Sequence, residues 1–191
     1  MKMVLAAVDN SPAGRPVLET AHVLAAILGA RVEAIHVLTN GARNATRAAE
    51  VADVPLRVVR GDVVDTLGGA ARVREVIALV IGARGSSAGV RALGRTASAV
   101  ATASSKPVVV VPPDAEICPI RRVLVPLEGS HSTVPTAAAI FELVRSTTID
   151  IVALHVVDEH AIPAFTDQPQ HEYAAFLAAH EAMAREHFTF G

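Results

Sequence analysis

KMVLAAVDNS, residues Lys2–Ser11, is a short apolar run that ends in a polar turn. An apolar run of the length of Met3–Val8 is typical of a buried strand. Ser11 precedes Pro12, which predicts a helix with Ser11 as its N-cap and Pro12 in its first position. Apolar residues then recur at helical spacing up to Gly29, where the helix is expected to end. This stretch therefore predicts a buried strand, a turn and an amphipathic helix.

The alternation of apolar runs and helical patterns continues to residue 111. Helices are expected over Val63–Glu75 and in the Ala-rich stretch before Pro107, whereas residues 41–53 fit either a short helix or a loop. Parallel strands need long crossover connections, usually helical, and this alternation supplies them. The sequence therefore predicts an α/β fold with one parallel sheet. The further strands are expected at Val32–Leu38, Leu56–Arg60, Val76–Ile81 and Pro107–Val111.

The first strand recurs later in the chain. KMVLAAVDNS at Lys2–Ser11 matches RRVLVPLEGS at Arg121–Ser130, an offset of 119 residues (121 minus 2). RVEAIHVL at Arg31–Leu38 matches DIVALHVV at Asp150–Val157 with the same offset. An offset that stays constant over strand, helix and strand predicts an internal repeat.

The repeat divides the chain into three parts. Residues 1–114 form the expected first domain, residues 115–120 a linker, and residues 121–191 the first half (β-α-β-α) of a second domain. The last helix of that half is expected over Glu172–His187, because apolar side chains form a stripe along it. The residues of this stripe are Tyr173, Phe176, Leu177, Met183 and Phe188.

Composition excludes several classes of protein. The 17 Lys+Arg against 19 Asp+Glu leave no basic excess that could neutralise nucleic-acid phosphates. The longest apolar run, Val76–Ile81, is too short to span a membrane, and the N-terminus lacks the pattern of a signal peptide. Cys118 is the only cysteine, so an internal disulfide cannot form and a reducing, cytoplasmic location is expected.

Candidate metal-binding and catalytic residues do not form a known pattern. His180 and His187 are seven residues apart, too far for the i, i+4 pair that holds zinc on one helix face. His36, next to a strand end, is expected to be a hydrogen-bonded structural residue. Ser11 is better explained as a helix cap than as a nucleophile. No metal site and no catalytic residue is therefore predicted.

Residues Gly82–Ser98, GARGSSAGVRALGRTAS, form a Gly-rich loop that leads into the Ala-rich helix. Such a loop lets backbone amides approach a phosphate, although the same glycines also suit a plain surface loop. Gly89, four residues, Gly94 and Arg95-Thr96 resemble a Walker A loop, but the loop follows the fourth strand and Arg replaces the lysine. No G-x-G-x-x-G follows the first strand either. A P-loop and a Rossmann fingerprint are therefore not predicted.

Four stretches together resemble the universal stress protein family: AVDNS, HVL, IGARG and PVVVVP. The resemblance covers about residues 2–113, and residues 121–191 as an incomplete second copy of a tandem protein. It implies a Rossmann-like (adenine nucleotide alpha hydrolase-like) sheet of five parallel strands in the order 3-2-1-4-5. It also implies ATP binding, which in this family accompanies G-x2-G-x9-G and a following Ser or Thr after the fourth strand.

Carried onto this sequence, the resemblance implies an adenine-nucleotide site at the carboxyl ends of the first, second and fourth strands. Asp9 would lie near the adenine and ribose, and Val37 would pack against the base. Gly85 and Gly94 would approach the phosphates. The expected site residues are Ala7, Val8, Asp9, Val37, Ile81, Gly82, Gly85, Gly94, Arg95 and Thr96.

The sequence departs from the family motif in its phosphate loop. Gly85 and Gly94 are separated by eight residues, one fewer than in the motif. Arg95 stands where the family has a small hydroxyl residue, and Thr96 comes one residue late. Either Thr96 takes that role and Arg95 adds charge toward the phosphates, or the site has lost nucleotide binding.

The expected function is stress adaptation through nucleotide binding, with ATP and Mg²⁺ as the expected ligands. Two alternatives remain: a module that acts through protein contacts because its phosphate loop is degenerate, and a slow ATPase. The second copy has Glu128 and Val156 at the positions of Asp9 and Val37, and it is expected to be a scaffold. Pro107–Val111, an uncharged apolar strand at the sheet edge, is expected to form a homodimer.

Overall fold

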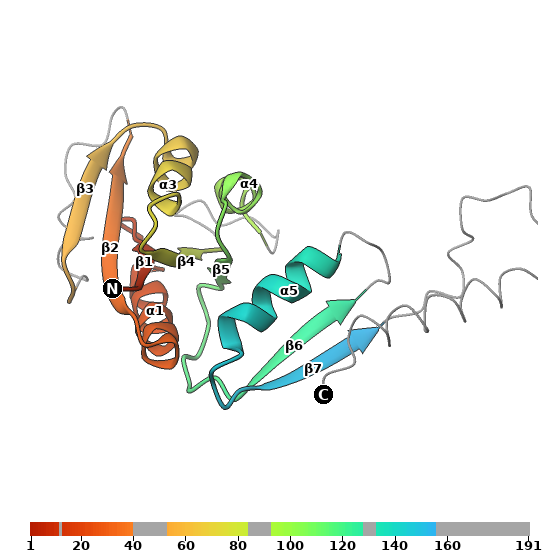
Figure 1. Ribbon diagram of the computed structural model, residues 1–191. Coiled ribbons are helices and arrows are strands. Elements are labelled where there is room, and N and C mark those ends of the chain that lie inside the picture. Colours follow the sequence, from red (N-terminus) through yellow and green to blue (C-terminus); the bar gives the residue numbers. More distant parts are fainter. Residues whose placement is uncertain (12, 40–52, 84–92, 128–132, 156–191) are drawn as a thin grey trace, which may run out of the picture. The chain divides into compact units, whose positions relative to one another are not determined.

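The computed structural model describes residues 1–11, 13–39, 53–83, 93–127 and 133–155 (Figure 1). The chain divides into two compact units, Met1–Ile120 and Arg121–Gly191. Each unit has a sheet of its own.

The first unit is built on five parallel strands, β1 (Met3–Ala7), β2 (Arg31–Leu38), β3 (Leu56–Arg60), β4 (Val76–Gly82) and β5 (Val108–Val111). They form one sheet in the order β3-β2-β1-β4-β5 (Figure 1). The α/β fold and the strand order expected from the sequence are thereby confirmed. The direction of strand addition reverses between β1 and β4, which is where open sheets of this type form a crevice.

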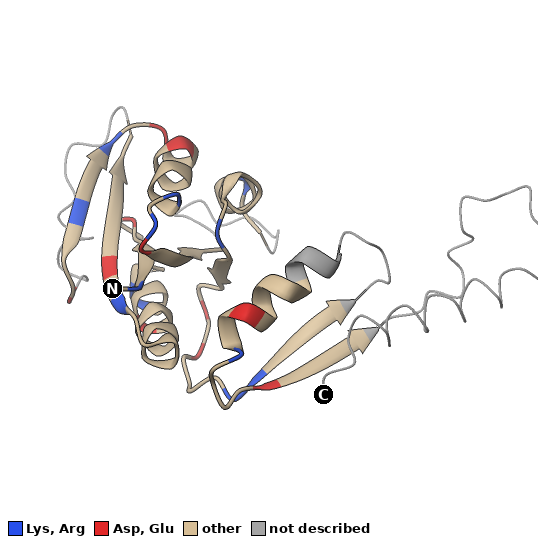
Figure 2. Cartoon of the chain, viewed as in Figure 1, with Lys and Arg blue, Asp and Glu red and all other residues tan. Residues whose placement is uncertain are grey.

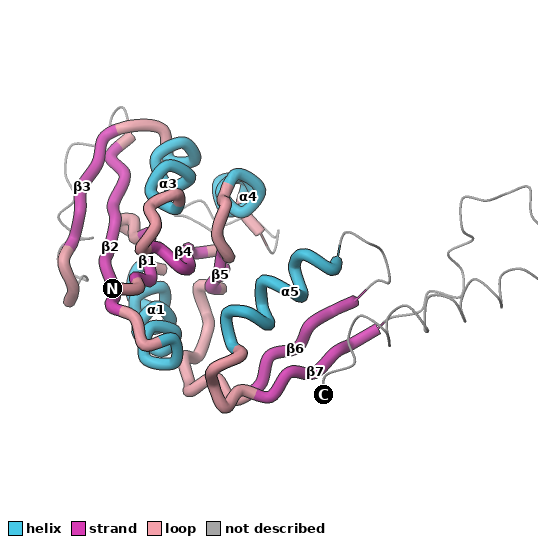
Figure 3. The backbone as a smooth tube through the Cα atoms, viewed as in Figure 1, coloured by secondary structure: helices cyan, strands magenta, loops and turns pink. Residues whose placement is uncertain are grey.

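Helices cover both faces of this sheet. α1 (Gly14–Leu28) packs on one face, and α3 (Val63–Ala71) and α4 (Arg95–Ala103) pack on the other (Figure 3). The neighbours Val4 and Leu5 of β1 are both fully buried, Val4 in the cluster under α1 and Leu5 in the cluster under α3 and α4. A strand covered on both faces must be apolar throughout, which is why β1 and β4 are nearly continuous apolar runs.

The predicted strands agree with the observed strands to within one residue at each end. β5 begins at Val108 and not at the predicted Pro107. Proline has no N–H, but the carbonyl of Pro107 already accepts a hydrogen bond from the Leu79 N–H of β4 at 3.0 Å. The Pro107 carbonyl thus already bonds to β4, and the strand begins at Val108, the residue opposite Leu79 in the ladder.

Helix α1 begins later than the sequence predicts. Its first residue is Gly14 and its N-cap residue is Ala13, so the prediction of Ser11 as N-cap is wrong. Pro12 lies outside the described residues. The Ser11 hydroxyl donates to Asp9 Oδ1 and accepts the Ala13 N–H at 3.3 Å, so it closes a turn ahead of the helix. The Ser11 hydroxyl thus bonds to Asp9 and does not provide the helix cap that the sequence predicts.

The end of α1 is as predicted. Gly29 is its C-cap residue with φ of 60°, and the Gly29 N–H donates to the carbonyl of Ala25. A left-handed residue at this position is the usual end of a helix, and glycine adopts it without steric cost.

Helix α3 ends at Ala71 and not at the predicted Glu75. The next residues form a tight turn in which the Val76 N–H donates to the Val73 carbonyl at 3.0 Å. The Met3 N–H donates to the Glu75 carbonyl at 2.8 Å, which sets the start of β4 beside β1. Residues 72–75 are needed for this turn, so the helix cannot include them.

The second unit contains β6 (Arg122–Leu127), α5 (Thr133–Val144) and β7 (Asp150–His155). β6 and β7 pair in parallel, and α5 packs on one face of the pair. Strand, helix and strand follow one another in the order that the repeat predicts. Residues 156–191 lie outside the described residues, so the incomplete second copy stays a prediction, as does the linker at residues 115–120.

Figure 2 marks where Lys, Arg, Asp and Glu occur along the described elements. Arg15 and Glu19 pair across one turn of α1 at 2.8 Å. Glu33 of β2 lies between Arg31 and Arg57, with N–O distances of 3.3 and 3.6 Å. In the described part of the chain, no helix is both long enough and apolar enough to span a membrane.

Candidate functional site

A cavity of about 550 Å³ opens at the carboxyl ends of β1, β2 and β4 in the first unit. Residues of α1, α3 and α4 complete its walls, because each of these helices begins where a strand of the sheet ends. The cavity lies where the strand order reverses, and open α/β sheets hold ligands at that place. Its volume is within the range of sites for small molecules.

Asp9 lies directly after β1 at the rim of this cavity and is exposed. The Ser11 N–H donates to its Oδ1 at 3.0 Å, and the Ser11 hydroxyl donates to the same oxygen. The Ser11 side chain is itself buried. These bonds fix the direction of the Asp9 carboxylate, and Oδ2 takes no part in them.

His36 of β2 fixes the backbone of Val8, the residue directly before Asp9. Its side chain is only 4% exposed, and its Nδ1 lies 2.8 Å from the carbonyl oxygen of Val8. A carbonyl oxygen can only accept, so Nδ1 carries the proton. The Val8 N–H donates to the Ile35 carbonyl at 2.9 Å, which ties the same residue to β2 a second time. His36 is therefore hydrogen-bonded and structural, as the sequence predicts.

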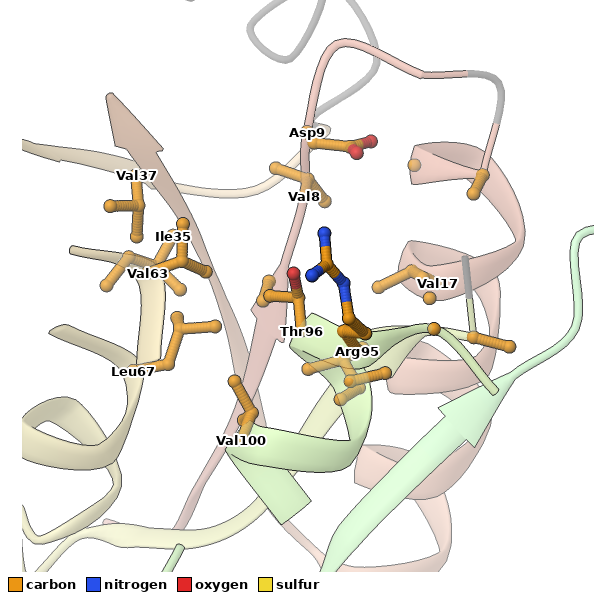
Figure 4. Close-up of a pocket in the computed structure, with 18 of the residues that line it drawn as sticks. Val8, Asp9, Val17, Ile35, Val37, Val63, Leu67, Arg95, Thr96 and Val100 are labelled. Carbon is orange, nitrogen blue, oxygen red and sulfur yellow. The ribbon is translucent and has the colours of Figure 1, made fainter. Parts of the chain in front are cut away.

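One side of the cavity is apolar. Figure 4 shows Ile35 and Val37 of β2 together with Val63 and Leu67 of α3 on this side. Ile35 and Leu67 belong to the buried cluster under α3 and α4, and Val37 and Val63 pack against it. Such a wall can accept a flat apolar group, with Asp9 at its rim to receive hydrogen-bond donors.

The opposite end of the cavity is the N-terminus of α4. Gly94 is the N-cap residue and has no side chain to accept the free N–H groups of the first turn. The Gly94 N–H donates to the Ala83 carbonyl at 2.8 Å, so the start of the helix is tied to the end of β4. In Figure 4 the Arg95 guanidinium extends toward Val8 and Asp9, with the Thr96 hydroxyl beside it. Free N–H groups, the helix dipole and a guanidinium together favour an anion.

The cavity has a negative and a positive side chain, which come from different parts of the first unit. Among the described residues that line it, Asp9 is the only acidic residue and Arg95 is the only basic one. The arrangement suits a ligand with hydrogen-bond donors, an apolar ring and an anionic group. In the described ranges, His, Cys, Asp and Glu do not gather in groups of three that could hold a metal ion.

The structure brings together all of the expected site residues that it describes. Ala7, Val8, Asp9, Val37, Ile81, Gly82, Gly94, Arg95 and Thr96 all line the cavity. Gly85 lies outside the described residues, as do Glu128 and Val156 of the second copy. That these residues bind a nucleotide stays a prediction.

Sequence reasoning missed the contributions of two helices. Gly14 and Val17 of α1, its N-cap residue Ala13, and Val63 and Leu67 of α3 also line the cavity. Their apolar spacing predicts core packing and gives no hint of a cavity. The signal that could have found them is topological, because helices that follow parallel strands begin at the ligand-binding edge.

The universal stress protein family model matches residues 39–112, a stretch that includes β3, β4 and β5. A comparison with curated proteins finds no match. A putative universal stress protein from Pseudomonas aeruginosa UCBPP-PA14 is 22% identical with a TM-score of 0.50, over 59% of this chain and 48% of that one. The first unit therefore has the fold of the universal stress proteins.

Two further similar structures contain a bound nucleotide. A universal stress protein in complex with cAMP is 27% identical with a TM-score of 0.44, over 58% of this chain and 95% of that one. The universal stress protein from Archaeoglobus fulgidus in complex with dAMP is 22% identical with a TM-score of 0.40, over 58% of this chain and 97% of that one.

Proposed function

We propose that the first unit binds an adenine nucleotide at the carboxyl edge of its sheet and acts as a nucleotide-responsive stress protein. One observation carries this proposal. A single cavity combines the Asp9 carboxylate, an apolar wall and the uncapped N-terminus of α4 with Arg95. The family model that matches residues 39–112 supports the stress role.

The two ends of the cavity correspond to the two ends of a nucleotide. The base would pack on Val37 and its apolar neighbours, and Asp9 would accept hydrogen bonds from the sugar hydroxyls or the base. The phosphates would lie at the first turn of α4, where Arg95 adds a positive charge that can bond two oxygens at once. Thr96 can donate its hydroxyl to the same phosphates.

Mg²⁺ would reach this site together with the phosphates of ATP. Magnesium is commonly bound by substrate phosphates, by water and by one or two carboxylates. Asp9, the only carboxylate among the described residues of the cavity, would be at the base and sugar, so phosphate oxygens and water would hold the ion. The ion would neutralise phosphate charge beyond what Arg95 can balance.

The described residues favour nucleotide binding without catalysis. General-base chemistry needs a base within hydrogen-bond reach of the group it activates. In the described part of the cavity, Asp9 is the only candidate base, and its Oδ1 is already bonded to Ser11. Ser11 also accepts the Ala13 N–H, so its hydroxyl is part of the turn.

Calorimetric titration of the full chain tests this function. ATP, AMP and adenosine are each titrated with and without Mg²⁺, and phosphate release is followed in parallel. We expect saturable binding of ATP and AMP without steady phosphate release. The absence of heat at millimolar nucleotide would favour the protein-interaction module, and steady phosphate release would favour the slow ATPase.

Three variants locate the site. Arg95→Ala should weaken ATP about tenfold and leave adenosine nearly unchanged, since a hydrogen bond to a charged group contributes about 1.5–3 kcal/mol. Asp9→Ala should weaken both ligands. Arg74→Ala is the matched control, because Arg74 is exposed in the turn at the amino end of β4, away from the cavity. Gly85→Val tests the phosphate loop, which lies outside the described residues.

A further inference from the structure

Among the described residues of the second unit, one face of the sheet has no covering helix. α5 covers the other face, where Val125 of β6 and Ala137 of α5 form a small buried core. On the bare face, Leu124 lies opposite Val152 and Pro126 lies opposite Leu154 in the ladder. These four side chains are all exposed, Leu124 by 55% and Leu154 by 42%. We call them the bare face.

The first unit shows how the same face is filled in a complete fold. By the offset of 119 residues, Leu124 corresponds to Leu5 and Leu154 to Ile35. Leu5 is 0% exposed and Ile35 is 1% exposed, because α3 and α4 cover them. At these two positions both units carry large apolar side chains, but in residues 121–127 and 133–155 the second unit supplies no helix to this face. An apolar sheet face must be buried against another layer.

The occupant must fit a surface two strands wide. Six-residue strands such as β6 and β7 span about 20 Å, and a pair of neighbouring strands is about 10 Å wide with its side chains. One helix is about 10–12 Å in diameter, and 17 residues of helix span about 25 Å. A single amphipathic helix therefore matches the bare face in both dimensions.

The chain itself contains such a segment. Glu172–Phe188 has apolar residues at helical spacing and predicts a helix with one apolar side. All six aromatic residues of the protein lie at or after Phe141, and three of them, Tyr173, Phe176 and Phe188, are in this segment. Residues 156–171 connect it to β7 and can extend to about 50 Å, more than enough to return over a strand.

The size of the bare face favours this tethered occupant over a second copy of the chain. A stable interface between separate proteins takes about 20–30 residues from each side. The bare face offers four side chains. A tethered segment needs less area, because the connection gives it an effective concentration on the order of millimolar.

We propose that Glu172–Phe188 forms a helix that covers the bare face of the β6–β7 sheet. Its apolar side would contact Leu124, Pro126, Val152 and Leu154, and its charged side would face the solvent. The helix thereby supplies the layer that α3 and α4 supply in the first unit. This interaction surface is separate from the proposed nucleotide site, so either proposal can fail without the other.

Disulfide trapping in the full chain tests the contact. In a Cys118→Ser background, Leu154→Cys is combined with Leu177→Cys on the apolar side of the predicted helix. One control replaces Leu177→Cys by Ala178→Cys, on the opposite helix side. The other combines Leu177→Cys with Ala138→Cys, on the exposed side of α5. We expect the first pair to close within one chain about tenfold faster than either control, since a disulfide needs Cα atoms about 4–7 Å apart.

Two results of this experiment would overturn the proposal. Equal closure rates in the three pairs would mean that the segment does not dock on the bare face. Bonds formed mainly between chains, at a rate that rises with protein concentration, would assign the bare face to a second copy.

Hydrogen exchange gives an independent measurement on the same protein. Phe176→Asp places a charge on the apolar side of the predicted helix, and Ala178→Asp places it on the opposite side. We expect amides of residues 122–127 and 150–155 to exchange several-fold faster in Phe176→Asp than in Ala178→Asp, because local opening becomes easier. Unchanged exchange in both variants would contradict the contact.

Discussion

At the scale of single residues, His36 fixes the backbone beside Asp9. Its Nδ1–H donates to the buried Val8 carbonyl at 2.8 Å. His36→Leu removes the donor and leaves that carbonyl without its side-chain partner, which costs about 1–3 kcal/mol. We expect urea denaturation to show this loss in the free energy of unfolding. Nucleotide binding should weaken as well, because Asp9 loses its fixed position.

His22→Leu is the matched control for this prediction. His22 is exposed on α1, and its one described side-chain bond is to the exposed Asp53. Exposed substitutions of this kind usually change stability by less than about 0.5 kcal/mol. Equal losses in the two variants would show that His36 has no special role at the end of β1.

Individual site residues were predictable where they follow strands. Asp9, Val37 and Gly82 lie at the carboxyl ends of parallel strands, and such ends meet at one edge of the sheet. The bonding of Ser11 was not predictable, because the spacing does not reveal whether its hydroxyl serves a helix or the carboxylate two residues before it. The role of Val17 in the cavity wall was not predictable either, because its position on α1 predicts only that it packs in the core.

At the scale of elements, Gly29 and Gly69 show how backbone conformation alone, without steric crowding, affects the stability of a helix. A Cβ at either position would meet nothing within 4 Å. Gly29 ends α1 with φ of 60°, so Gly29→Ala forces alanine into the left-handed region and should destabilise by about 1–2 kcal/mol. Gly69 lies within α3, where alanine is the better helix former, so Gly69→Ala should stabilise by about 0.5–1 kcal/mol. Thermal unfolding of the two variants measures both signs, and equal signs would contradict the placement of Gly29 at a helix end and of Gly69 inside a helix.

A pH effect is expected where α1 meets the segment before β3. His22 Nε2 lies 3.1 Å from Asp53 Oδ1, and this hydrogen bond holds the pKa of Asp53 below its ordinary value of 3.8. A carboxyl with a lowered folded-state pKa contributes stability above its unfolded pKa and loses it as the pH falls through the folded pKa. The pair is exposed, so the contribution is at most about 0.5 kcal/mol.

His22→Ala tests this pair directly. We expect the pKa of Asp53 to rise to near 3.8 in an NMR titration of the side-chain carboxyl carbon. Removal of the imidazole takes away the hydrogen bond that is the main cause of the lowered pKa of Asp53. An unchanged titration curve would show that the pair does not form in solution.

Strands were more predictable than helix ends in this chain. The central strands β1 and β4 are buried on both faces, so their apolar runs have sharp limits in the sequence. The end of α3 depends on where Val76 must begin β4 beside Met3, which is a tertiary requirement. The sequence between Ala71 and Val76 contains no local pattern that indicates this requirement.

At the scale of the whole molecule, we expect the chain to associate through the edge of the first sheet. β5 is the last strand in the order, and its residues carry no charge (Figure 2). The Leu79 N–H bonds to the Pro107 carbonyl and the Ala83 N–H to the Val111 carbonyl, so residues 107, 109 and 111 face β4. In a parallel ladder the intervening residues direct their N–H and C=O groups the other way. Among the residues that the structure describes, Val108 and Val110 therefore have outward backbone groups without a strand partner.

An uncharged edge of this kind is a template for strand pairing, so we expect a twofold homodimer through β5. Val110→Pro removes one outward N–H and keeps the bonds to β4, and proline is tolerated in edge strands. Val58→Pro is the matched control, because Val58 lies at the opposite edge in β3 and is also directed outward. Light scattering at micromolar concentration should give twice 19.8 kDa for the unmodified chain and for Val58→Pro, and 19.8 kDa for Val110→Pro. Val109→Lys, which adds a charge at the same edge, should also lower the mass. A mass of 19.8 kDa for the unmodified chain would exclude the dimer, and loss of the dimer in Val58→Pro alone would move the interface to β3.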